Sequence, residues 1–317
     1  MRSALIIGAG GQDGRLLAPL LLGRGYAVRG WTRTEHPAAA PCECVVIDIS
    51  ELAAVDAELR RFPPDEIYYL AAFHHSTEDT IEESAAELLR RSFDVHVLGL
   101  VNVLQGMKEC CPRARLFYAA SSHVFGTPSG EWQNEKTPML PTSAYGISKA
   151  AGIQCCQFYR REKGVFAATG ILFNHESPLR KASFLSQKIV GGALQARHNP
   201  AYRLVLGDLD AKIDCGYAPD YVDAMFRILQ LPEPSDFVVA SGEFHTVREF
   251  VQTAFDALNL DWRRHVEIDP GLLNRVSHPL RGDSGKLRAA TGWLPTIGFA
   301  EMVAKLVHEA EKTDKAL

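Results

Sequence analysis

The stretch Ala4–Gly14, ALIIGAGGQDG, joins an apolar run to a loop of closely spaced glycines. Four consecutive apolar residues are typical of a buried strand, and residues 14–25, GRLLAPLLLGRG, have the spacing of a helix closed by glycine. Glycines between a strand and a helix permit a tight turn and a close approach to phosphate, and the helix N-terminus attracts an anion. The stretch predicts a loop that binds the pyrophosphate of a dinucleotide, with a plain strand-to-helix turn as the alternative. The loop residues expected to contact the dinucleotide are Gly8, Gly11, Gln12, Asp13 and Gly14.

Short apolar runs alternate with helical segments along the first half of the chain. Further strands are expected at residues 26–31, 42–48, 65–72, 114–120 and 165–173, and long helices at 83–110 and 144–164. This repeated order predicts an α/β fold with a doubly wound parallel (Rossmann) sheet. From about Asn174 the elements become shorter and richer in Pro, Gly and Asp. We therefore expect a dinucleotide-binding domain at 1–173 and a smaller C-terminal α/β substrate-binding region at 174–317, from which the chain can return to the first sheet.

The bulk composition narrows the class of protein. With 317 residues and 46% hydrophobic residues the chain can bury a large core, and its net charge of −4 comes with scattered basic residues. This balance argues against a nucleic acid or a membrane as partner. The sequence passes from Met1 almost directly into the first strand, so we expect a cytoplasmic protein without a signal peptide. The seven cysteines lack the spacing of a zinc site, and no third ligand accompanies His175 and Glu176, so no metal is expected.

The end of the second expected strand indicates which dinucleotide binds. An acidic residue there would hold the ribose hydroxyls of NAD, but the sequence runs GWTRT, with Arg33 and no carboxylate before Glu35. A guanidinium favours the 2′-phosphate of NADP through charge-assisted hydrogen bonds. NADP is therefore the predicted cofactor, with a solvated surface arginine as the alternative reading of Arg33.

Tyr145 and Lys149 are four residues apart in the segment SAYGISK and share one face of the expected helix. A lysine ammonium near a phenol lowers the pKa of the phenol, so Tyr145 is a candidate acid/base for a hydroxyl that is oxidised to a ketone. Upstream, the expected strand of FYAASSHVFG ends in Ser121, Ser122 and His123. These three residues read either as catalytic groups or as a satisfied turn.

In these motifs the sequence resembles the extended short-chain dehydrogenase/reductase family, and within it the GDP-mannose 4,6-dehydratases most closely. The resemblance rests on GAGGQDG, FYAASSHVFG, SAYGISK, GILFNHESPLR, LGDLDAKIDCGYAPDYVDAM and VVASGEFHTVREFV, which span most of the chain. It implies a nucleotide-sugar enzyme that holds NADP tightly, with Tyr145, Lys149, Leu70 and Ala71 beside the cofactor. It also implies that Ser122, Asn174, Arg180, Lys188 and Arg275 bind a nucleotide sugar, GDP-linked in the closest relatives.

Other polar residues near strand ends allow two readings. Asp48 and Ile49 match the position where the family contacts adenine, but an Asp after a strand is also a common helix N-cap. His74 and His75 follow the strand that would pass under the nicotinamide ribose. A histidine pair at a strand end is more often part of a turn, so we leave both out of the expected catalytic set.

One departure from the family changes the chemistry. The resemblance places Ser121 on a threonine that orients the sugar 4-hydroxyl, and His123 on the glutamate that removes the C5 proton. Neutral imidazole is a competent base near pH 7, so 4,6-dehydration through a 4-keto sugar is the first hypothesis. The second is a 4-keto-sugar reductase or epimerase that has lost elimination, and a purely structural His123 is a further alternative. A regulatory protein that only binds NADP(H) is disfavoured, because Ser121, Tyr145 and Lys149 are all retained.

Further departures concern assembly and substrate. The loop TRTEHPAAAPCE is shorter than the arginine-rich loop of the family that reaches a neighbouring subunit, so we expect a homodimer formed through the two long helices. The family's KRDWG is KIDCG here, with Ile213 and Cys215 in place of Arg and Trp, and RVSHPLRGD is shortened. Guanine as the base of the substrate is therefore a hypothesis.

Overall fold

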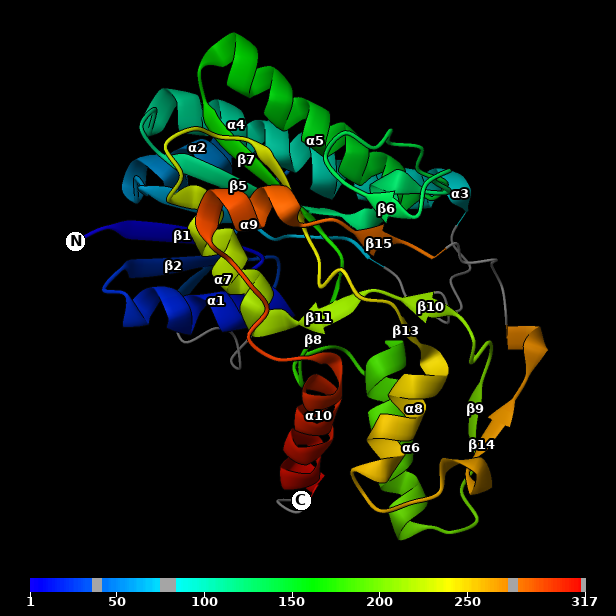
Figure 1. Cartoon of the computed structure of the whole chain (residues 1–317). Helices are drawn as coiled ribbons and strands as arrows, with labels where there is room; N and C mark the ends of the chain where they lie inside the picture. The colour runs from blue at the N-terminus through cyan, green and yellow to red at the C-terminus, as the bar shows by residue number, and fades with distance from the viewer. Residues whose placement is uncertain (36–41, 75–83, 273–278, 315–317) are drawn as a thin grey trace.

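The computed structural model describes residues 1–35, 42–74, 84–272 and 279–314. Its centre is a seven-stranded parallel sheet in the order β12-β7-β5-β4-β1-β2-β3 (Figure 1). The strands are β1 (Ser3–Ile7), β2 (Ala27–Thr32), β3 (Glu43–Val46), β4 (Glu66–Tyr69), β5 (Arg115–Ser121), β7 (Phe166–Leu172) and β12 (Asp236–Val239). The predicted doubly wound α/β fold is confirmed.

Helices cover both faces of this sheet because its strands are apolar on both sides. In β1, Leu5 and Ile7 face one buried cluster while Ala4 and Ile6 face another, as the two-residue period of a strand requires. The first cluster includes side chains of α2 (Leu52–Arg61), α4 (Gly99–Cys110) and α5 (Ala144–Lys163). The second includes side chains of α1 (Gln12–Gly23), α7 (Ala218–Leu229) and α9 (Gly285–Thr291).

The segment expected as one helix at 83–110 is interrupted. It consists of α3 (Ala85–Phe93), a π-helical turn at Asp94–Leu98, and α4. A π turn shifts the side chains that follow relative to a regular helix, and such turns are frequent at functional sites. Here the turn carries His96, which is fully buried.

A second region lies below the sheet in Figure 1 and has its own core. That core is formed by α6 (Leu185–His198), α8 (Val247–Asp256), α10 (Phe299–Asp314) and the strand pair β9 (Leu204–Leu206) and β14 (Val266–Ile268). Three further pairs of short strands are β8 (Asn174–Glu176) with β11 (Cys215–Tyr217), β10 (Lys212–Ile213) with β13 (His245–Thr246), and β6 (Trp132–Gln133) with β15 (Arg281–Gly282). Short 3₁₀ helices occupy Ser122–Phe125, Trp262–Arg264 and Pro270–Leu272.

The chain crosses between the two regions more than once. After β8 and α6 it returns to the central sheet, where β12 pairs in parallel with β7. The division at residues 173 and 174 therefore stays a prediction about the main boundary.

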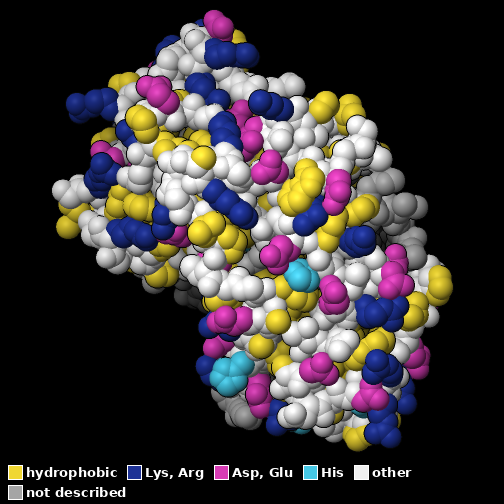
Figure 2. All heavy atoms as spheres, viewed as in Figure 1, with side chains coloured by type: hydrophobic (Ala, Val, Ile, Leu, Met, Phe, Trp, Pro, Cys, Tyr) yellow, Lys and Arg dark blue, Asp and Glu magenta, His cyan; other side chains and the backbone are white. Residues whose placement is uncertain are grey.

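The surface shows basic, acidic and apolar side chains interspersed over the face drawn in Figure 2. In the described part of the chain, no helix combines the length and apolar character needed to cross a membrane.

Candidate active site

The glycine loop lies at the carboxyl end of β1, between the ends of β2 and β4. Gly8 has a φ of +92°, and a β-carbon there would lie 2.7 Å from the backbone nitrogen of Ala71. The Gly8 amide donates to the carbonyl of Trp31, and the Leu70 amide donates to the carbonyl of Ile7, each at 2.9 Å. Only glycine fits this close approach, so Gly8 lies directly against the backbone of Leu70 and Ala71.

The loop ends at the N-terminus of α1. Gly11 is the exposed N-cap residue and has no side chain to occupy the helix end. Gly14 is buried against the loop. A β-carbon there would lie 2.7 Å from the Cα of Ala9, so a larger residue would not fit. The residues present therefore fit a dinucleotide, since the loop leaves its backbone accessible where a pyrophosphate would meet the helix.

Gln12 and Asp13 connect this loop to the second region. The Asp13 carboxylate lies 3.1 Å from His175 Nε2, and the Gln12 amide donates to the carbonyl of His175 at 3.2 Å. Burial opposes the charge of Asp13, but the charge and hydrogen bond of His175 outweigh it and lower the pKa of Asp13. The pKa of His175 is raised, because the Asp13 carboxylate outweighs the desolvation of the imidazole. The two side chains therefore form an ion pair that fixes the loop against β8.

Arg33 is exposed directly after β2, where the sequence places a cation for the 2′-phosphate. Nearby, Asp48 accepts hydrogen bonds from the amide (2.9 Å) and the hydroxyl (2.7 Å) of Ser50. These bonds, with the charge of Arg33, lower the pKa of Asp48. Asp48 is not the N-cap of α2, because Glu51 occupies that position, so its side chain stabilises the turn before the helix. Ile49 packs partly buried against the core.

Tyr145 lies in the first turn of α5, at the end of β5. The helix begins there because Ser143 caps it, accepting from the amide of Gly146 at 3.1 Å. Desolvation raises the pKa of Tyr145 to about 12, while a hydrogen bond with Ser121 and the charge of Arg180 lower it in part. The phenol therefore keeps its proton at neutral pH.

Lys149 is fully enclosed on the same helix face, as its spacing predicts. Its Nζ donates to the carbonyl of Ala119 at 2.7 Å and lies 5.7 Å from the centre of the Tyr145 ring. Burial lowers the pKa of Lys149 to about 7. Ser121 and Arg180 are neighbours that lower the pKa of Tyr145, and the expectation that Lys149 also lowers it stays a prediction.

His123 stands beside Tyr145, with ring centroids 5.6 Å apart and the rings perpendicular at 89°. It is exposed and belongs to the 3₁₀ turn whose first residue, Ser122, is buried. Gly146 allows this approach, because a β-carbon there would lie 2.6 Å from the carbonyl oxygen of His123. The structure thus brings Ser121, His123, Tyr145 and Lys149 together at one strand end.

Two more histidines touch Tyr145: His74, which we had left out of the expected catalytic set, and His96, which the sequence did not single out. The ring of His74 lies 4.6 Å from that of Tyr145 and the ring of His96 lies 5.2 Å from it, both edge-on. His74 had been assigned to turn chemistry, yet it faces the tyrosine from the end of β4; His75 lies outside the described residues. The only signal for His96 was a histidine inside the otherwise apolar run VHVLGL.

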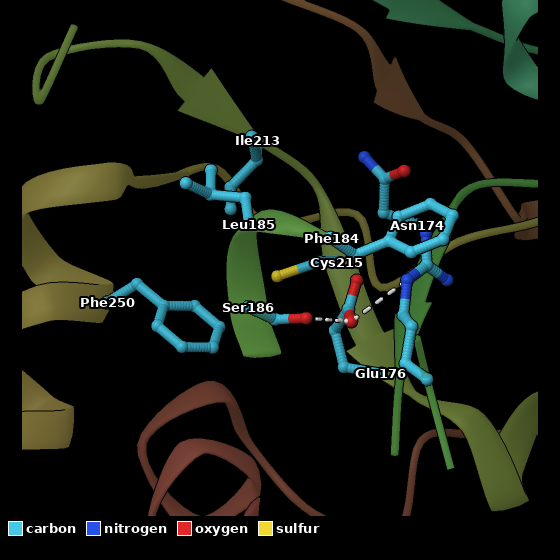
Figure 3. A pocket seen from close by; sticks show the side chains of 9 residues that line it. Asn174, Glu176, Phe184, Leu185, Ser186, Ile213, Cys215 and Phe250 are labelled. Carbon is cyan, nitrogen blue, oxygen red and sulfur yellow. Dashed lines mark hydrogen bonds and ion pairs between the residues drawn. The ribbon is translucent and has the colours of Figure 1, made fainter. Parts of the chain in front are cut away.

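A cavity of about 120 Å³ opens in the second region (Figure 3). Its lining residues are Asn174, Glu176, Arg180, Phe184, Leu185, Ser186, Ile213, Cys215 and Phe250. The buried Glu176 carboxylate accepts from the Ser186 hydroxyl and pairs with Arg180 Nε at 3.3 Å. Of the expected substrate residues, Asn174 and Arg180 line the cavity, Lys188 sits in the first turn of α6 beside it, and Arg275 lies outside the described residues.

All seven cysteines are free thiols. Within the described ranges, no group of three His, Cys, Asp or Glu side chains is placed to hold a metal ion. The candidate chemistry therefore rests on the Tyr145 neighbourhood and the cavity.

Comparison with known proteins gives three findings. GDP-mannose 4,6 dehydratase 2 of Arabidopsis thaliana is 34% identical over 327 residues, covering 96% of this chain and 86% of that protein. The solved structure of dTDP-glucose 4,6-dehydratase from Bacillus anthracis in complex with NAD has a TM-score of 0.84 at 18% identity, covering 99% of this chain and 98% of that chain. The solved structure of RMD from Pseudomonas aeruginosa complexed with NADPH has a TM-score of 0.80 at 23% identity. The match covers 98% of this chain and 100% of that chain.

The two solved structures support the fold, whereas the family follows from sequence. The family model described as GDP-mannose 4,6 dehydratase matches residues 5–306, almost the whole chain. Together with the curated relative, this match confirms the resemblance carried by the motifs. The chain belongs to the GDP-mannose 4,6-dehydratase family of short-chain dehydrogenases/reductases.

Proposed function

We propose that this protein is an NADP-dependent nucleotide-sugar 4,6-dehydratase that acts on a GDP-mannose-type substrate through a 4-keto intermediate. The observation that carries the proposal is the arrangement at the end of β5, where Ser121 hydrogen-bonds Tyr145 and His123 stands beside it. This group adjoins a glycine loop that fits a dinucleotide, in a chain whose curated relatives are GDP-mannose 4,6 dehydratases.

The residues divide the chemistry as follows. Tyr145 exchanges the proton of the sugar 4-hydroxyl, and Ser121 orients that hydroxyl through their shared hydrogen bond. Lys149 lies 5.7 Å from the centre of the tyrosine ring, and its amine would hold the ribose of a bound cofactor. His123, as neutral imidazole, takes the C5 proton. A bound nicotinamide supplies hydride acceptance at C4 and hydride return to C6.

The choice of NADP is supported by Arg33, which is exposed directly after β2 in a segment with no acidic residue before Glu35. Replacing Arg33 by Ala should weaken NADPH binding by about tenfold and leave NADH binding unchanged, because only the former carries the 2′-phosphate. Fluorescence titration of the purified protein with each nucleotide measures both affinities. Equal weakening for the two nucleotides would contradict the assignment.

Three finer points belong to the same proposal. A GDP-linked substrate is supported by the names of the curated relatives. A homodimer through the two long helical segments is supported by the exposed apolar side chains of Leu98, in the π-helical turn before α4, and Phe158, in α5. Sedimentation velocity tests it. The cytoplasmic location stays a prediction from the sequence.

The proposal is tested by product analysis. Purified protein is incubated with GDP-mannose and NADP⁺ in deuterated water, and the product is examined by mass spectrometry. We expect the loss of one water with one solvent deuterium fixed in the sugar. Unchanged GDP-mannose would contradict the substrate assignment.

His123 is tested in the same assay by replacement with Ala. Because a positioned acid/base contributes about 100-fold or more, we expect water loss to fall by at least that factor. Oxidation at C4, seen as reduced nicotinamide in a single turnover, should persist, since it needs only Tyr145 and its partners. Intact elimination in His123→Ala would show that His123 is not the base.

One observation favours a second candidate function, a 4-keto-sugar reductase or epimerase. The carboxylates described near Tyr145 are engaged in ion pairs, Asp13 with His175 and Glu176 with Arg180, so neither replaces the missing glutamate base. Steady consumption of NADPH with a 4-keto nucleotide sugar would support a reductase, because a dehydratase recycles its cofactor.

A further inference from the structure

Three imidazole rings surround Tyr145, and their surroundings differ. His96 is fully buried, its Nε2 accepts from the amide of Phe73 at 2.9 Å, and its Nδ1 lies 2.8 Å from the hydroxyl of Ser148. These partners assign the proton to Nδ1, and burial, with the charge of Lys149, puts the pKa of His96 well below its usual value. His96 therefore stays neutral and has no nitrogen left for a substrate.

His96 instead holds two parts of the site together. Through Phe73 it fixes the backbone next to His74 at the end of β4. Through Ser148, whose hydroxyl donates to the carbonyl of Tyr145 at 3.0 Å, it contacts the first turns of α5. The distance between His74 and Tyr145 is thus set by the hydrogen bonds that His96 makes with Phe73 and Ser148.

His74 lies between Tyr145 and Phe184, a residue that lines the cavity. One side of its ring meets Tyr145 edge-on at 4.6 Å, and its face stacks on Phe184 at 5.4 Å and 21°. Phe184 lines the cavity (Figure 3). The Arg180 guanidinium lies 4.1 Å from the centre of the Phe184 ring. Phe184 therefore contacts both His74 and Arg180, and it links the Tyr145 neighbourhood to the cavity.

His74 and His123 also face each other, with ring centroids 6.2 Å apart. Both retain contact with solvent, unlike His96. The two rings meet edge to face at 79°, and each also lies against Tyr145. Imidazole can serve either as a base or, once protonated, as an acid. The site thus holds two proton-transfer groups besides Tyr145.

Resting on the function proposed above, we propose that His74 is the general acid of the elimination and that His123 is its base. The neutral His123 imidazole takes the C5 proton, and the electron pair of that C–H bond forms the C5–C6 double bond. The C6–O bond breaks with its electron pair on oxygen, which takes a proton from the His74 imidazolium and leaves as water. His123 then carries one added proton and His74 lacks one, so charge and electrons balance.

A general acid at His74 predicts a result that a purely structural His74 does not predict. In His74→Asn, water loss from the nucleotide sugar should fall by about 100-fold or more, because the leaving hydroxyl is no longer protonated. A substrate in which chlorine replaces the 6-hydroxyl needs no acid, so chloride loss by this variant should stay within about tenfold of the unmodified protein. His123→Ala should lose both reactions, and His308→Asn, which changes an exposed histidine of α10, should lose neither.

Further measurements separate the possible failures. Nucleotide-sugar affinity by calorimetry and single-turnover formation of reduced nicotinamide report whether His74→Asn keeps the fold and C4 oxidation. Full water loss in that variant, or equal loss with both leaving groups, would overturn the acid role. If the unmodified protein itself releases neither water nor chloride, the proposed dehydratase function fails, which is a different result.

Discussion

Replacing Tyr145 by Phe should lower kcat by about 100-fold or more, in every direction of the proposed reaction. The phenol is the group that exchanges the proton of the 4-hydroxyl, and a positioned acid/base contributes about 10²–10⁴ to the rate. Two buried neighbours of the phenol cannot replace it. His96 has both nitrogens engaged, and the ammonium of Lys149 is held at the carbonyl of Ala119.

The measurement is single-turnover formation of reduced nicotinamide from the nucleotide sugar. Tyr159→Phe is a matched control, because Tyr159 lies on the same helix and its hydroxyl donates to Gln105 at 3.2 Å, away from the site. That control should keep its rate, while both variants should keep nucleotide affinity. Normal oxidation by Tyr145→Phe would show that another group handles the hydroxyl proton.

Replacing Lys149 by Met should raise stability at neutral pH and remove a pH dependence of stability that the unmodified protein shows. Burial lowers the pKa of Lys149 from 10.5 to about 7 in the folded chain. Between these values the unfolded chain binds a proton that the folded chain does not, so the free energy of unfolding rises with pH. The slope is at most about 1.4 kcal/mol per pH unit, and it vanishes above 10.5 and below 7.

Urea unfolding at several pH values between 7 and 10 tests this prediction. The free energy of unfolding of the unmodified protein, minus that of Lys149→Met, should increase steadily over this range. Lys163→Met, which changes an exposed lysine in the last turn of the same helix, should give a difference that does not vary with pH. A constant difference for Lys149→Met would mean that the buried amine is charged in both states. The same variant should also lose most of its oxidation of the sugar, since the amine that would hold the cofactor ribose is gone.

The sequence alone determined the features that depend on neighbours along the chain. Apolar runs broken by glycine and by helical spacing are local patterns, and they predicted the parallel sheet, the loop at Gly8 and the helix that carries Tyr145 and Lys149. The cluster of polar residues from Ser121 to His123 at a strand end could also be predicted, because these residues are adjacent in the sequence. The family followed from motifs that are themselves short and contiguous.

Only the tertiary structure decided which distant residues meet. His74, His96 and His123 come from the ends of different elements, and no spacing in the sequence indicates that all three rings touch Tyr145. The pairing of Asp13 with His175 likewise joins residues 162 positions apart. The pKa of Tyr145 is decided in the same way, because it depends on burial and on through-space neighbours, which the order of residues does not contain. The sequence therefore determines which groups are available for proton transfer. Packing determines which of these groups are in contact and which of them carry a proton.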